Sequence, residues 1–199
     1  MRSKKNQLTF HQKKKILTPK LVREIFSWLL ITLFAIAIAF GLFYSFGMKV
    51  SVIGESMEPL CYNSQDVLID RLFCRIVSPK KGDVIAFLPN GNVNSHYYVK
   101  RIVATSGDTL QIIDGELYIN GEISGEDKEY FDKMEDAGIA ENPIKLESGQ
   151  FFVLGDNRNS SEDSRSANIG IVTSNMIVGK AWYIVHNEAH DGGFIFNTY

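Results

Sequence analysis

A serine and a lysine in this chain have the residue types and settings needed for nucleophilic catalysis. Ser56 lies in the segment Gly54-Glu55-Ser56-Met57-Glu58-Pro59, and Lys100 lies in Tyr98-Val99-Lys100-Arg101-Ile102-Val103. A serine hydroxyl is a poor nucleophile until a neighbouring base takes its proton. A lysine amine can be that base only when it is neutral, and burial lowers its pKa in that direction. The two segments therefore suggest a Ser–Lys hydrolase, if Lys100 points inward.

Two other interpretations remain open on these residues alone. A histidine could be the base in a Ser-His-Asp arrangement, and His96 lies near the lysine segment. However, His96 follows Asn92-Val93-Asn94-Ser95 and is interpreted as an exposed loop residue. Lys100 and Arg101 could also be solvated charges on a strand, and composition alone favours that interpretation. A third polar segment, residues 155–165, could likewise be a solvated turn.

An uncharged apolar run from Ile25 to Met48 separates a basic tail from an acidic remainder. As a helix it would span roughly 35 Å, enough for a bilayer core of about 30 Å. It also exceeds the apolar core of a cleaved signal sequence, roughly 7–15 residues. Residues 1–24 carry eight Lys and Arg against one acidic residue, and residues 25–199 carry 13 basic and 22 acidic residues. The positive-inside rule therefore predicts a cytoplasmic tail (1–24), a transmembrane helix (25–48) and an extracytoplasmic domain (49–199).

The pattern of residues 49–199 is typical of short strands bounded by turn residues. Asp114-Gly115 between two apolar segments predicts a hairpin within residues 109–122. Further strands are predicted at 66–70, 83–88, 97–104, 150–154 and 181–185. The charged stretch 126–137 is interpreted as a short helix or loop. The sequence thus predicts a mainly β, antiparallel catalytic domain with a smaller subdomain inserted at about 109–149.

Two cysteines, Cys61 and Cys74, fall in the part predicted to be exported. A disulfide is permitted there, but the spacing does not decide between a disulfide and two unpaired thiols. No further ligand cluster accompanies them, so no metal is expected, and the chemistry requires no cofactor. No basic segment follows the N-terminal tail, so a nucleic-acid partner is not expected either.

The order and placement of the motifs resemble those of the bacterial type I signal peptidases, in the single-anchor form of Gram-positive bacteria. The resemblance runs from the apolar run to about Val185. It rests on Ser-Met-x-Pro at 56–59, Gly-Asp-Val-Ile-Ala-Phe at 82–87, Tyr-Val-Lys-Arg-Ile-Val at 98–103 followed by Gly107-Asp108, and Gly-Asp-Asn-Arg-x-x-Ser-x-Asp-Ser-Arg at 155–165. The last motif is the most specific. The resemblance implies a mostly β catalytic domain with a smaller insert, and endoproteolytic removal of signal peptides from secreted preproteins.

The resemblance also implies a role for each matching residue. Ser56 would be the nucleophile, Lys100 the general base, and Ser161 the residue whose hydroxyl orients the lysine amine. A charged structural network would comprise Arg101, Asp156, Asp163 and Arg165. Shallow pockets for small substrate side chains would be lined by Val52, Ile53, Met57, Tyr98 and Val99.

Two positions depart from the family's pattern. Gly54 stands where some members have a serine that helps to bind the oxyanion. The oxyanion hole would then rest on backbone N–H groups, chiefly that of Ser56, with Gly54 permitting an unusual turn. Leu60 stands where the family usually has threonine. We expect activity despite both.

The resemblance implies a single-pass cell-membrane protein whose partners are preprotein signal peptides and membrane lipid, with the secretion translocon as a further candidate. Two other functions are compatible with similar motifs: a non-catalytic assembly factor or chaperone for surface pili, and a self-cleaving Ser–Lys regulator. Retention of both Ser56 and Lys100 argues against the first. The apolar run and the lack of a recognisable DNA-binding segment argue against the second.

Overall fold

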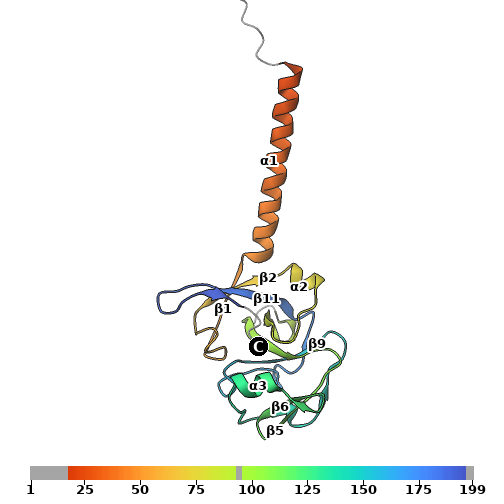
Figure 1. Cartoon of the computed structure of the whole chain (residues 1–199), viewed down its shortest axis with the longest axis vertical. Helices are drawn as coiled ribbons and strands as arrows, with labels where there is room; N and C mark the ends of the chain where they lie inside the picture. The colour runs from red at the N-terminus through yellow and green to blue at the C-terminus, as the bar shows by residue number, and fades with distance from the viewer. Residues whose placement is uncertain (1–17, 93–95, 196–199) are drawn as a thin grey trace, which may run out of the picture. The chain divides into compact units, whose positions relative to one another are not determined.

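The computed structural model describes residues 18–92 and 96–195. The chain divides into two units, residues 1–41 and 42–199. The described part of the first unit is helical, whereas the second contains every strand found among the described residues. Figure 1 labels several of the elements.

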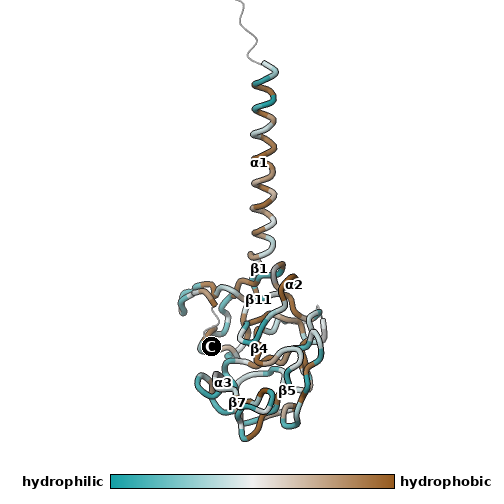
Figure 2. Tube along the Cα trace, turned by 45° about the vertical axis from the view of Figure 1, so that its right-hand side comes forward, coloured by the Kyte–Doolittle hydropathy of each residue, from teal (hydrophilic) through white to brown (hydrophobic). Residues whose placement is uncertain are grey.

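Helix α1 (Pro19–Phe46) contains the apolar run. It begins after Thr18, whose hydroxyl accepts a hydrogen bond from the Leu21 N–H at 3.3 Å, and Pro19 at the first helical position has no N–H to leave unpaired. Its mean hydropathy reaches 2.5, and by length and composition it could cross a membrane. Figure 2 shows its long apolar stretch in brown. The helix starts before the predicted Ile25 because the preceding charged residues are compatible with helix, and it ends before Met48, which opens the first strand.

An eight-stranded sheet is the larger of the two sheets described in residues 42–199. The order of its strands is β1-β2-β11-β3-β4-β9-β10, with β12 paired to β11, and all these pairs are antiparallel. Its strands are β1 (Met48–Ser51), β2 (Asp66–Asp70), β3 (Val84–Phe87), β4 (Tyr98–Ala104), β9 (Gln150–Leu154), β10 (Val172–Thr173), β11 (Ile177–Ile184) and β12 (Gly193–Phe194). Two short helices, α2 (Phe73–Ile76) and the 3-10 turn Pro89–Gly91, connect its strands.

A second sheet of four antiparallel strands lies between β4 and β9 in the sequence. Its order is β7-β6-β5-β8, with bounds β5 (Thr109–Ile113), β6 (Glu116–Ile119), β7 (Glu122–Ile123) and β8 (Ile144–Lys145). Asp114 and Gly115 both have positive φ, 51° and 77°, which allows the tight turn between β5 and β6. Helix α3 (Gly125–Tyr130) and the 3-10 turn Gly138–Glu141 follow β7. This sheet lies at the end of residues 42–199 opposite β1 and β2 (Figure 1).

The prediction of a mainly antiparallel β fold with one N-terminal apolar helix is confirmed. Strand β11 is longer than the predicted 181–185, because its first half pairs with β3 and its second half with β2. One apolar cluster includes Val50, Val52 and Met57, so it reaches the segment that carries Ser56. A second cluster joins the smaller sheet to β4 and β9 through Leu110, Leu117 and Phe152. The core therefore fixes both sheets around the polar segment that follows β9.

Candidate active site

Ser56 lies in a tight turn between β1 and β2. The chain leaves β1 with the Val52 N–H bonded to the Gln65 carbonyl at 2.8 Å. Gly54 then adopts φ of +81°, a conformation that L side chains rarely adopt. The next residues are anchored by Met57, whose side chain is fully buried in the core. The turn therefore holds Ser56 at the edge of the core, with 8% of its surface exposed.

Lys100 points into the same region from the middle of β4. That strand is paired with β3 on one side, where Lys100 is opposite Ile85, and with β9 on the other. Both neighbours of β4 are buried strands, and Lys100 itself is only 3% exposed. The condition set by the sequence, an inward-pointing lysine, is thus met.

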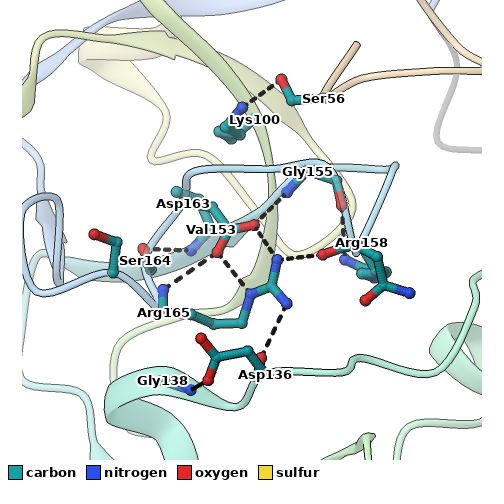
Figure 3. A network of polar contacts seen from close by, with 12 residues as sticks. Ser56, Lys100, Asp136, Gly138, Val153, Gly155, Arg158, Asp163, Ser164 and Arg165 are labelled. Carbon is teal, nitrogen blue, oxygen red and sulfur yellow. Dashed lines mark hydrogen bonds and ion pairs between the residues drawn. The ribbon is translucent and has the colours of Figure 1, made fainter. Parts of the chain in front are cut away.

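The Lys100 amine and the Ser56 hydroxyl are in direct contact. Nζ lies 2.5 Å from Oγ, although the residues are 44 positions apart in the chain (Figure 3). Burial lowers the pKa of Lys100 to about 8, while the nearby carboxylates of Asp163, Glu162 and Asp156 act in the opposite direction. A lysine with this pKa has a substantial neutral fraction near neutral pH and can accept the proton of a hydroxyl.

Two backbone N–H groups beside Ser56 differ in their availability. The Gly54 N–H donates to Asn63 Oδ1 at 3.0 Å and is therefore occupied. The Ser56 N–H has no acceptor among the residues that the structure describes. Of these two N–H groups, that of Ser56 could therefore stabilise an oxyanion.

A cavity of about 270 Å³ opens beside these two side chains. It is lined by Val52–Ser56 on one side, by His96–Lys100 on another, and by Ser160 and Glu162. Four of the five residues predicted to contact substrate (Val52, Ile53, Tyr98 and Val99) line it, whereas Met57 does not. His96 is exposed at the cavity wall. Its position makes a direct test of the histidine alternative necessary.

The polar segment 155–165, called here the 155–165 loop, packs directly against the backbone of Ser56. The Asn157 N–H donates to the Ser56 carbonyl at 3.1 Å. A Cβ on Gly155 would lie 2.2 Å from Ser161 Oγ and 2.4 Å from the Ser56 carbonyl oxygen. Only glycine allows this close approach. Neither Gly155 nor Asn157 had a role in the sequence prediction, although the first glycine of a polar run was a usable signal.

Ser161 lies near the backbone of Ser56, but its hydroxyl does not make the expected hydrogen bond with the Lys100 amine. Its Oγ is buried and has no hydrogen-bond partner in the described part of the chain. It abuts Gly155, as the Ser56 carbonyl does. Its predicted role in orienting the Lys100 amine therefore stays a prediction.

The four residues assigned to a charged network form two buried ion pairs. Arg101 donates to both carboxylate oxygens of Asp156, from Nε at 2.7 Å and from Nη2 at 2.6 Å. Arg165 donates to both oxygens of Asp163 at 2.9 Å. Asp163 Oδ2 also accepts the Gly155 N–H at 3.1 Å, as Figure 3 shows. The first pair therefore attaches the start of the 155–165 loop to β4, and the second braces the end of the loop internally.

A third buried pair was missed by the sequence prediction. The Arg158 guanidinium bonds Asp127 of α3, donates to the Gly155 carbonyl at 3.1 Å, and lies 3.9 Å from the centre of the Phe131 ring. Arg158 belongs to the quoted polar motif, but Asp127 lies in a charged stretch of the sequence that gave no signal of this pairing.

The two cysteines are free thiols. Burial, with Asp156 and Asp66 acting in the same direction, raises the pKa of Cys61 to about 12. Burial also raises the pKa of Cys74 to about 11. Within the described ranges, no three His, Cys, Asp or Glu side chains form a group that could hold a metal ion.

Comparison with known proteins gives concordant similarities. Residues 25–186 match the family described as signal peptidase, peptidase S26. The chain is 32% identical over 139 residues to signal peptidase I T of Bacillus subtilis strain 168, covering 66% of this chain and 69% of that protein. It is 31% identical over 165 residues to signal peptidase I P of Bacillus subtilis subsp. natto, covering 78% and 86%. A crystal structure of a signal peptidase I from Enterococcus faecalis V583 is 29% identical and covers 52% of this chain and 97% of that chain, with a TM-score of 0.38.

Proposed function

This chain belongs to the signal peptidase family, peptidase S26, and on that premise we propose that it cleaves signal peptides from exported preproteins with Ser56 as nucleophile and Lys100 as general base. The observation that carries the assignment is the 2.5 Å separation of Lys100 Nζ and Ser56 Oγ at the wall of a cavity. The lowered pKa of Lys100, to about 8, supports it because the base must be neutral to act.

The reaction proceeds through an acyl-enzyme. Lys100 accepts the Ser56 proton as Oγ attacks the scissile carbonyl, and the Ser56 N–H stabilises the resulting oxyanion. Lys100 then gives the proton to the leaving amine, so that the mature protein departs. Water activated by the same amine hydrolyses the ester and restores Ser56. The balance of protons closes without any other group.

We further propose that substrate enters along the cavity between residues 52–54 and 97–100. Val52 and Val99 are buried and would line shallow pockets for small substrate side chains, which is the selectivity expected of this family. Tyr98 and the exposed Ile53 would complete the lining.

We propose that α1 anchors the enzyme as a single-pass protein with the basic residues 1–24 in the cytoplasm. The domain that follows would then face the outside, where preproteins emerge. Lipid and the secretion translocon would be partners there. Confining enzyme and signal peptide to one membrane surface raises their effective concentration.

Three variants of the detergent-solubilised chain test the assignment. Ser56→Ala and Lys100→Ala should each abolish the new mature N-terminus of a signal-peptide-bearing preprotein, read by mass spectrometry. His96→Ala should cleave within about twofold of wild type, because its side chain has no part in the mechanism. Loss of cleavage in His96→Ala alone would restore the histidine triad. Cleavage by none of the proteins, wild type included, would favour the assembly factor, and self-cleavage alone would favour the regulator.

A further inference from the structure

The segment of the smaller subdomain from α3 to the 3-10 turn, residues 127–139, makes a series of polar contacts with the 155–165 loop. Asp127 pairs with Arg158. Asn159 donates to the Lys133 carbonyl at 3.0 Å and accepts the Glu135 N–H at 3.0 Å. At the end of the loop, Arg165 Nη1 donates to the Asp136 carbonyl at 3.1 Å, and the Arg165 carbonyl accepts the Ile139 N–H at 3.0 Å. The contacts thus hold the loop at three points along its length.

The same loop touches the nucleophile's own backbone. Asn157, next to Arg158, bonds the Ser56 carbonyl, and Gly155 approaches that carbonyl too closely to carry a Cβ. Arg158 Nη1 bonds the Gly155 carbonyl directly. From Asp127 to Ser56, therefore, the path runs through Arg158 and then through either Gly155 or Asn157.

The Asp127–Arg158 pair is buried, so the loop should respond strongly to the loss of either partner. The side chain of Arg158 is 0% exposed and that of Asp127 is 7% exposed. Buried ion pairs contribute little net stability, but removal of one partner leaves an uncompensated charge. Such pairs can be retained because they select one arrangement of the chain, and here the arrangement selected is that of the loop against Ser56.

We propose that Asp127 and Asn159 are positioning residues of the active site, through which residues 127–139 clamp the 155–165 loop and hold Ser56 in register with Lys100. The proposal rests on the proposed function, because it assumes that these two side chains perform the chemistry. Neither Asp127 nor Asn159 lines the cavity beside Ser56. Their effect on the reaction would be exerted only through the loop.

The test is steady-state kinetics of Asp127→Asn in the full-length, detergent-solubilised chain. The substitution keeps the size of the side chain and removes its charge. A displacement of about 1 Å at a catalytic group can cost on the order of 100-fold in rate, so we expect kcat to fall about 10- to 100-fold. KM should change less, because most of the cavity lining comes from residues 52–56 and 96–100. The matched control is Glu116→Gln, which removes the ion pairs with the exposed Lys133 at 3.0 Å and Lys128 at 3.8 Å in the same subdomain and should leave kcat within about twofold.

A second readout separates positioning from loss of folded protein. The charged groups that act on the Lys100 amine all belong to the loop: Asp156, Glu162, Asp163 and Arg165. The ring of Tyr98, 5.9 Å away on β4, and the Ser56 hydroxyl complete its surroundings. A loosened loop admits water and weakens the burial of the amine, which raises its pKa, whereas withdrawal of the three carboxylates lowers it. Burial outweighs the carboxylates in the intact site, so the apparent pKa of kcat/KM should rise. Partial unfolding would lower kcat without moving that pKa.

Asp127→Asn decides the question if at least nine-tenths of it is folded at the assay temperature. If it is not, Asn159→Ala decides, because Asn159 is exposed and its loss leaves no buried charge. The proposal would be overturned if the deciding variant had the kcat of wild type. It would also be overturned if kcat fell only as much as the amount of folded protein and the apparent pKa of kcat/KM did not move. Cleavage that persists in Ser56→Ala would instead overturn the proposed function, which keeps the two failures distinct.

Discussion

The pH dependence of cleavage provides the sharpest check on a lysine base. With the pKa of Lys100 at about 8, the neutral fraction of the amine would be about 1% at pH 6, about 9% at pH 7, about half at pH 8 and about nine-tenths at pH 9. An unperturbed lysine would be neutral in only about 0.03% of molecules at pH 7. Burial in β4 would thus raise the active fraction at pH 7 by about 300-fold.

Initial rates with a signal-peptide-bearing substrate, in detergent and at low substrate concentration, give kcat/KM across pH 6–10. We expect a slope of about one decade per pH unit below pH 7 and a plateau above pH 9. His96→Ala should reproduce this profile, because His96 lines the cavity but lies outside the mechanism. A flat profile between pH 6 and 9 with folded protein, or a midpoint near 6.5 that disappears in His96→Ala, would refute the reasoning.

Two further outcomes follow from the packing of the site. Gly155→Ala places a Cβ 2.4 Å from the Ser56 carbonyl oxygen, so the loop must move by about 1 Å, and we expect kcat to fall roughly 100-fold. The control is Gly193→Ala, whose Cβ meets no atom within 4 Å. Equal rates in both variants would contradict the close approach of Gly155 to Ser56. Lys100→Met should be more stable than wild type at pH 7 by up to about 3 kcal/mol, because the folded-state pKa of Lys100, about 8, lies below its unfolded value. The protonated amine therefore destabilises the folded wild-type protein at and below pH 7. This destabilisation fades as the pH rises from 8 toward 10. Thermal unfolding of both proteins in detergent at pH 7 and pH 10 measures the gain, and a gain that persists undiminished at pH 10 would be inconsistent with a charged buried amine.

The sequence predicted the parts of this protein that depend on local pattern. The alternation in β4 and the turn residues around β5 and β6 indicated strands, and motif order associated Ser56 with Lys100. Boundaries were less well predicted where two structures compete for one residue: Met48 is apolar enough for a membrane helix, yet it pairs with Ile69 as the first residue of β1.

Contacts between distant segments could not be predicted in this way. Asp127 and Arg158 are 31 positions apart and look like ordinary surface charges in sequence. Their pairing depends on how the smaller sheet packs against β4 and β9, which no spacing rule specifies. Gly155 is similar, because its need for glycine comes from the Ser56 carbonyl on another segment.

The free thiols have a consequence for the conditions in which the site can operate. Thiolate, and not thiol, reacts with oxidants and alkylating agents. Because the pKa of Cys61 is about 12 and that of Cys74 about 11, both sulfurs remain protonated at the alkaline pH where the amine of Lys100 is already neutral. Over the range of about three pH units between these pKa values, the Lys100 amine is neutral and can act as a base, while both thiols remain protonated and unreactive. If the domain lies outside the cytoplasm, as proposed, this separation would protect both thiols from oxidation at the pH where cleavage is fastest.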